Sequence, residues 1–267
     1  MHQRNRAFSL VELSIVLVIL GLLTGGILGG QSLIRAAEMR AIPTEHGRWV
    51  AAAQTFRDKY FALPGDMSNA TKFWGTADAA SCALTSTGDA RTCDGNGNGV
   101  LNYSFSGNAA HEHFRFWQQL ANAGLIEGNY SGTRHYLSTD GGENQQWDNY
   151  QRAVNVPSSK MSQGTWSASG DYPFTSGSAF FPLTYGTNVL MVGGNVGFNV
   201  PYNPLLKPEE AWNIDTKMDD GLAVQGKVFG IFLTNCTNAA TRTDTANGTY
   251  NLTNSAAACA LIFPGAF

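Results

Sequence analysis

The sequence lacks the short motifs that mark the common catalytic and nucleotide-binding sites. It contains no G-x-S-x-G nucleophile elbow, no H-E-x-x-H zinc motif and no phosphate-binding P-loop. The glycine-rich run Gly95–Gly99 is not a dinucleotide fingerprint, because no predicted strand precedes it and no predicted helix follows it at the required places. We therefore predict that the protein is not an enzyme.

Charged residues are also scarce. They make up 14% of the 267 residues, and their balance is slightly acidic, with a formal net charge of -3. A chain with this balance has no global attraction for nucleic acid, so no nucleic-acid partner is predicted. Low-complexity tails and internal repeats are missing too, whereas Gly, Asn, Ser and Thr are abundant. This composition is typical of a loop-rich β domain outside the cytoplasm.

One long segment is almost free of charge. Between Arg6 and Arg35 the only charged residue is Glu12. The apolar run Leu13–Ile34 is long enough to cross a bilayer as one helix, since about 20 apolar residues suffice. A secretory signal peptide has its small-residue cleavage site after the apolar region. Here a short basic leader comes directly before the apolar run, so the segment is not an ordinary secretory signal.

The residues at the end of the leader resemble a known processing site. Ala7 is followed by Phe8-Ser-Leu-Val-Glu12-Leu and then by the apolar helix. This layout resembles the cleavage site of type IV pilins and type II secretion pseudopilins. The resemblance implies that a prepilin peptidase cuts between Ala7 and Phe8 and methylates the new amino terminus, and that the apolar helix stays in the mature protein. Ala7 departs from the family pattern, in which Gly most often precedes the cut.

Glu12 matches the carboxylate of that family's helix. A carboxylate within the apolar core of a membrane costs about 2.5 to 3.5 kcal/mol on insertion scales, so it is expected to have a partner. The free amine of Phe8 in a neighbouring subunit would serve as that partner, and both residues would then act in assembly. The alternative is that Glu12, near the membrane edge, merely reaches the lipid headgroups.

The helix is predicted to continue beyond the membrane. Apolar residues recur at helical spacing between Trp49 and Tyr60 with charged residues between them, which indicates one buried stripe. The string Leu63-Pro64-Gly65-Asp66 is a strong turn signal that ends the segment. The expected organisation is a leader at 1–7, a transmembrane and assembly half-helix at 8–34, an amphipathic half-helix at 35–63 and a globular extracytoplasmic α+β domain at 64–267.

The predicted fold class is α+β and pilin-like. A long N-terminal helix, whose first half spans the membrane, is expected to pack on a loop-rich antiparallel β-sheet domain. Residues 64–267 are enough for one domain with its own core. Further helices are predicted at Ala110–Ala123 and Lys207–Gly221, and strands at Asn188–Val192, Val196–Val200 and Lys227–Leu233.

The four cysteines all follow the apolar helix, which places them on the oxidising side of the membrane if the helix crosses it. Three pairings are available. The one that closes the shortest loops joins Cys82 to Cys93 and Cys236 to Cys259, and the second pair resembles the C-terminal disulfide region of many pilins. No zinc site is expected, because the cysteines have no C-x-x-C spacing.

Oxygen-bearing side chains recur at alternate positions after Cys93, as in the first half of a calcium loop. The bidentate Glu that completes such a loop is missing from its usual place. Glu112, at the start of the next predicted helix, is therefore the candidate for the second carboxylate. The predicted Ca²⁺ ligands are Asp94, Asn96, Asn98, Glu112 and the backbone carbonyl of Val100. The alternative is an ordinary Asn/Gly turn, and the flanking His111 and His113 are expected on the surface.

The resulting hypothesis is a structural subunit of a bacterial type IV pilus-like filament, and more specifically a minor or decorated pilin. Its implied partners are prepilin peptidase, other pilin subunits and an inner-membrane assembly platform. The protein would cross the inner membrane once, with its globular domain in the periplasm, and would later lie in a periplasmic or surface filament. The first alternative is a pseudopilin of a type II secretion system. The second is a membrane-anchored binding protein or enzyme.

Overall fold

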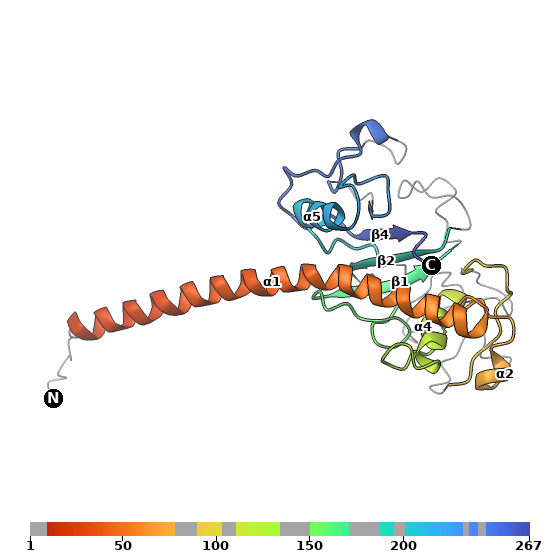
Figure 1. Ribbon diagram of the computed structural model, residues 1–267. Helices are drawn as coiled ribbons and strands as arrows, with labels where there is room; N and C mark the ends of the chain where they lie inside the picture. Colours follow the sequence, from red (N-terminus) through yellow and green to blue (C-terminus); the bar gives the residue numbers. More distant parts are fainter. Residues whose placement is uncertain are drawn as a thin grey trace, which may run out of the picture.

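A computed structural model of the chain describes residues 10–77, 90–102, 111–133, 150–170, 187–194, 201–231, 235–239 and 244–267. The fold is α+β: one long N-terminal helix packs against a small antiparallel sheet and extends far beyond it (Figure 1). Shorter helices and long connecting segments surround the sheet.

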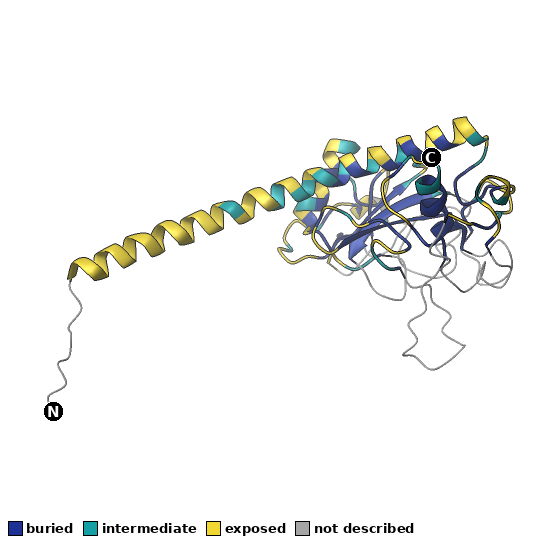
Figure 2. Cartoon of the chain, turned by 90° about the horizontal axis from the view of Figure 1, so that it is seen from below, coloured by how far each residue is buried: buried dark blue, intermediate teal, exposed yellow. Residues whose placement is uncertain are grey.

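Helix α1 runs without interruption from Leu10 to Tyr60, a length of 51 residues, and passes through Pro43. Its first half is exposed, whereas its second half lies on the globular part (Figure 2). The helix is long and apolar enough to cross a membrane, and its most apolar window is not buried within the protein. The residues that α1 buries are Ile42, Glu45, Trp49, Ala52, Ala53 and Phe56.

The sheet has the strand order β1-β2-β4-β3, and all of its strand pairs are antiparallel. The strands are β1 (Gly164–Ser169), β2 (Val189–Gly194), β3 (Phe229–Gly230) and β4 (Leu261–Pro264). Strand β2 matches the predicted strand at Asn188–Val192 and pairs with β1 and β4. The predicted strand at Val196–Val200 lies outside the described residues.

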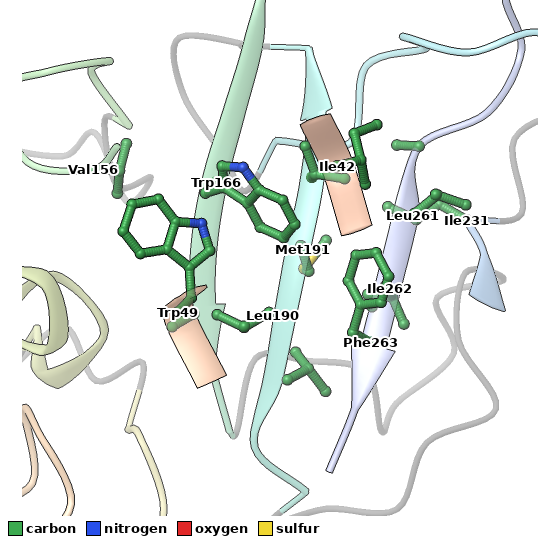
Figure 3. Packing of buried hydrophobic residues seen from close by; sticks show 14 of the residues in the cluster. Ile42, Trp49, Val156, Trp166, Leu190, Met191, Ile231, Leu261, Ile262 and Phe263 are labelled. Carbon is green, nitrogen blue, oxygen red and sulfur yellow. The ribbon is translucent and has the colours of Figure 1, made fainter. Parts of the chain in front are cut away.

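The main core lies between α1 and the sheet. Ile42 and Trp49 of α1 lie over the strands, beside Trp166 of β1 and Phe263 of β4 (Figure 3). The rings of Trp166 and Phe263 are stacked with centroids 5.7 Å apart. Each large apolar side chain removed from water contributes about 1.5–3 kcal/mol, so this interface is a main source of stability.

Two further helices match the sequence prediction. Helix α4 (Glu112–Asn122) packs against β1 and α1, and helix α5 (Pro208–Met218) packs against α1. Helix α5 starts with a proline followed by two glutamates, which suits the orphan amides and the positive end of the helix dipole. The remaining short elements are α2 (Thr71–Trp74) and the 3₁₀ turn η1 (Thr245–Asn247).

A buried carboxylate fixes α1 to the start of β1. Glu45 accepts hydrogen bonds from the Ser159 hydroxyl at 2.7 Å, the Lys160 amide at 2.7 Å and the Trp166 indole N–H at 2.8 Å. Only 5% of Glu45 is exposed. A buried charge is tolerated when several donors satisfy it. Glu45 therefore sets the position of the helix along the sheet.

Candidate functional site

The predicted processing residues, Ala7 and Phe8, lie outside the described residues. Glu12 lies in the first turn of α1, on the exposed part of the helix. The amino-terminal end of a helix carries a partial positive charge, which favours a carboxylate at this place. The structure thus shows Glu12 on a helix that starts close to the predicted cleavage site.

The apolar half of α1 forms a long hydrophobic surface in the isolated chain. The exposed fractions of its large apolar side chains range from 50% at Ile19 to 85% at Leu10. Soluble monomers rarely expose a continuous apolar surface of this extent. Lipid or neighbouring helices are the environments that would cover it.

The sequence model of one family matches residues 2–28, and the description of that family is the prokaryotic N-terminal methylation motif. The chain carries this methylation motif. The methylation motif is the prepilin-type signal of type IV pilins and pseudopilins, as the resemblance at Ala7 to Glu12 indicated. It implies processing by prepilin peptidase and assembly with other pilins, and together with the apolar helix it fits anchoring in a membrane. Neither the curated proteins nor the solved structures contain a match to the chain.

An ion-pair cluster marks the point where α1 enters the globular part. The Arg35 guanidinium donates from Nε and Nη2 to the two carboxylate oxygens of Glu210, at 2.7 and 2.6 Å. It also donates to the Leu205 carbonyl at 3.0 Å and to Glu38 at 3.2 Å. Burial raises the pKa of Glu210, but the hydrogen bonds from Arg35 and the Lys207 amide, together with the charges of both residues, outweigh it and leave that pKa below its usual value. The pair fixes the first turn of α5 to α1.

The predicted calcium loop wraps around two carboxylates. Glu112, at the start of α4, accepts backbone N–H bonds from Asn96 at 2.9 Å and from Asn102 at 2.8 Å. Asp66, in the turn after α1, accepts from the backbone amides of Gly97 at 2.7 Å and Gly99 at 2.7 Å. The loop therefore connects the turn after α1 to the start of α4 through carboxylate–amide bonds, which are stronger than neutral ones.

The predicted ligands lie in one loop, apart from Glu112 at the start of α4, but their side-chain oxygens accept hydrogen bonds. Asp94 turns toward α2, where it accepts from the backbone amide and the hydroxyl of Thr71 at 2.8 and 3.2 Å. The side-chain oxygen of Asn96 accepts from the Asn98 amide, and that of Asn98 from the Val100 amide. These contacts are those of Asx turns. An ion at this place would have to share or replace amide donors, and Ca²⁺ binding stays a prediction.

Sequence reasoning missed Asp66, because its place in the Leu63-Pro64-Gly65-Asp66 string indicates only a turn. The turn lies directly against the loop: the Gly95 amide donates to the Met67 carbonyl at 2.8 Å. A side chain at Gly65 would meet the Glu112 carbonyl at 2.3 Å, so only glycine fits there. The sequence signal that could have pointed to Asp66 was an acidic residue in a glycine turn, together with the glycine-rich loop Gly95–Gly99 further along the chain.

The electrostatics of this region follow from burial. Burial raises the pKa of Glu112 to about 7, and the nearby charge of Asp66 adds to the effect, while the amides of Asn102 and Asn96 oppose it. Burial also lowers the pKa of Arg115 to about 10. Arg115 donates to the Asp94 carbonyl at 3.0 Å, so a cation lies close to the predicted ligands.

The prediction that His111 and His113 are surface residues was wrong. Both have no exposed surface, and the whole of α4 from Glu112 to Leu120 is buried. The His113 ring packs against Phe114 with centroids 4.2 Å apart. Helix α4 is covered on all sides by the rest of the domain, a situation that the spacing of its largest apolar residues does not reveal.

The acidic end of α5 anchors the segment that follows it. Asp215 is buried and accepts from the Tyr250 hydroxyl at 2.9 Å and the Gly221 amide at 3.1 Å. Asp220 accepts from the Leu222 amide at 2.8 Å. Burial raises the pKa of Asp215 to about 7, with the neighbouring acids adding to the shift and the two hydrogen bonds opposing it.

A disulfide joins Cys236 to Cys259, as the shortest-loop pairing predicted, with an S–S distance of 2.02 Å. It connects residues 235–239 to the segment that leads into β4. Cys93 is also disulfide-bonded. Its predicted partner, Cys82, lies outside the described residues.

Proposed function

We propose that the chain is a subunit of a bacterial type IV pilus-like filament, most consistent in size with a minor or decorated pilin at 28.7 kDa. The observation that carries this proposal is the continuity of α1. The methylation motif runs directly into a helix whose most apolar window is not buried within the protein, while the other half packs on the globular part. Such a helix is suited to a bilayer before assembly and to a bundle of like helices afterwards.

The proposed sequence of events follows from the same helix. The chain enters the inner membrane as a single span with its globular domain in the periplasm. Prepilin peptidase removes residues 1–7 and methylates Phe8, and an inner-membrane assembly platform adds the subunit to the filament. Glu12 then pairs with the Phe8 amine of a neighbouring copy, which supports the burial of its charge among apolar helices. Pilins and pseudopilins are structural subunits, and no reaction is assigned to this chain.

A pseudopilin of a type II secretion system is the alternative within the same class. The two differ in where the filament ends, since a pilus extends from the cell surface and a pseudopilus stays in the periplasm. The test is to shear intact cells and compare the amounts of mature protein in the sheared fraction and in the cell envelope. Mature protein in sheared filaments supports a pilus. Mature protein found only in the envelope supports the pseudopilin.

The role of Glu12 gives the sharper test of filament assembly. Mass spectrometry of the wild-type chain should show a methylated amino terminus at Phe8. The Glu12→Ala variant should be inserted and cleaved like the wild type but should be lost from filaments. Ser14→Ala is the matched control, because the Ser14 hydroxyl bonds only to the Val11 carbonyl in the same turn among the described residues. Normal assembly of Glu12→Ala, or an uncleaved amino terminus, contradicts the proposal.

A further inference from the structure

The residue that follows helix α1 has an unfavourable backbone conformation in the isolated chain. Phe61 directly follows the helix and adopts a left-handed backbone conformation with φ 53°. Its amide donates to the Arg57 carbonyl at 2.8 Å, which closes the last turn. Glycine is the usual residue at such a position, and a bulky side chain there is strained. The Phe61 side chain is nevertheless 93% exposed, so it gains almost no burial in return.

A hydrophobic groove lies at the other end of the packed half of α1. It has a volume of about 430 Å³ and lies between α1 and α5. Its apolar lining comes from Ala36, Met39, Pro43, Ile214 and Met218. A cavity of about 150 Å³ is enough to hold a benzene ring, so the groove has room for a phenyl side chain. Methionine side chains are adaptable and make favourable contacts with aromatic rings.

The groove and Phe61 cannot meet within one chain. At 1.5 Å per residue, the helix separates them by about 30 Å. Helix α5 lies where α1 enters the globular part, and the end of α1 lies at the opposite side, near α2 (Figure 1). A protruding side chain and a matching groove at opposite ends of one subunit form a head-to-tail contact between copies, and such contacts build open helical filaments.

We propose that Phe61 of one subunit inserts into the α1/α5 groove of a second copy of this chain in the filament. The strained, exposed Phe61 is then buried, which explains its presence at a position that suits glycine. The exposed acid Asp58 lies one turn before Phe61, and the exposed bases Arg40 and Lys217 border the groove. Of the three charged residues just before Phe61, Asp58 has the sign that the groove bases attract, whereas Arg57 and Lys59 oppose it.

This inference rests on the proposed filament function, and the test separates the two. The photoreactive residue p-benzoylphenylalanine replaces Phe61, and assembled filaments are irradiated and mapped by mass spectrometry. The expected adduct has twice the subunit mass and joins residue 61 to Met39 or Met218. The same probe at Phe73, which is 55% exposed near the same end, is the matched control and should not label the groove. Filaments without an adduct in the groove overturn the contact but leave the filament function intact. A wild-type chain that forms no filament overturns both.

A second variant distinguishes contact from folding. Phe61→Gly removes the ring and suits the backbone, so the full chain in detergent should melt no lower than the wild type. Its association should weaken by about tenfold to hundredfold, the change expected when burial of one Phe side chain is lost. A lower melting temperature together with the assembly loss overturns the proposal, because Phe61 would then act in folding.

A charge swap tests the orientation of the contact. Asp58→Lys should reduce the adduct, and adding Lys217→Asp should restore it. No recovery contradicts the proposed orientation.

Discussion

Arg35 and Glu210 form a two-pronged ion pair between the long helix and α5, with N–O distances of 2.7 and 2.6 Å. Arg35 directly follows the apolar run, so the pair lies where the helix leaves the membrane in the proposed topology. It therefore sets the direction in which the globular part is held relative to the apolar half of α1.

Glu210→Gln should lower the stability of the full chain by about 1.5–3 kcal/mol, the range for hydrogen bonds to charged groups. The pKa of Glu210 is lowered in the folded protein, so its contribution is present above the ordinary carboxyl range and is lost as the pH falls through the folded pKa. The measurement is denaturant unfolding between pH 3 and 7. The wild type should lose its advantage over the variant on acidification. A constant difference across this range contradicts the prediction, and Glu209→Gln, an exposed neighbour, is the control.

Asp215→Asn should remove a contribution to the pH dependence of stability whose sign is opposite to that of Glu210. Because burial raises the pKa of Asp215 to about 7, the folded protein binds a proton more tightly than the unfolded chain. Ionisation of Asp215 therefore destabilises the fold, and stability should increase as the pH falls from about 7 toward the ordinary carboxyl pKa of about 4. Asparagine keeps an acceptor for the Gly221 amide and has no charge. Melting curves of the wild type and variant from pH 4 to 8 should converge at the acidic end.

Chelation of calcium should lower the melting temperature of the full chain if the loop at Asp94 binds the ion. Ligand linkage predicts about 2.7 kcal/mol of stabilisation at a hundredfold excess over the dissociation constant. Asp94→Ala and Glu112→Ala should each abolish the calcium-dependent part. Calorimetry with calcium and with chelator gives the comparison. Identical melting in both would assign the loop to hydrogen-bonded turns held by Asp66 and Glu112.

The disulfide between Cys236 and Cys259 closes a loop with a sequence separation of 23. Replacing both cysteines by Ala should cost about 3 kcal/mol in the loop-entropy model. Peptide mapping without reduction should recover this link and a second one between Cys82 and Cys93. A mapped link between either of the first two cysteines and either of the last two would reject the pairing.

The helices were predictable because their signals are local. An apolar run, a periodic stripe from Trp49 to Tyr60 and a proline at the start of α5 need only neighbouring residues to be recognised. The order of the strands was not predictable, because β2 pairs with β1 and with β4, which lies far along the chain. Strand β1, with its alternating small polar residues, gives a weak signal, and its burial depends on α1 and α4.

The candidate site shows the same division. Glu12 and the cleavage residues form a contiguous motif that can be recognised from sequence alone, whereas the carboxylates around the Gly95–Gly99 loop come from three separate segments. Asp66 is brought to that loop by the turn after α1, and Glu112 by α4. The burial of His113 depends on tertiary packing that its own helix does not encode.

The attachment of Glu45 has a mechanical consequence. The hydrogen bonds from Ser159, Lys160 and Trp166 all end on the carboxylate of Glu45. A pull along the axis of α1 therefore loads all three bonds at the same time. The load is therefore shared among several bonds that must break together instead of one after another. Tension in the helix is passed to β1 at this point, and the sheet beyond it resists detachment as one unit.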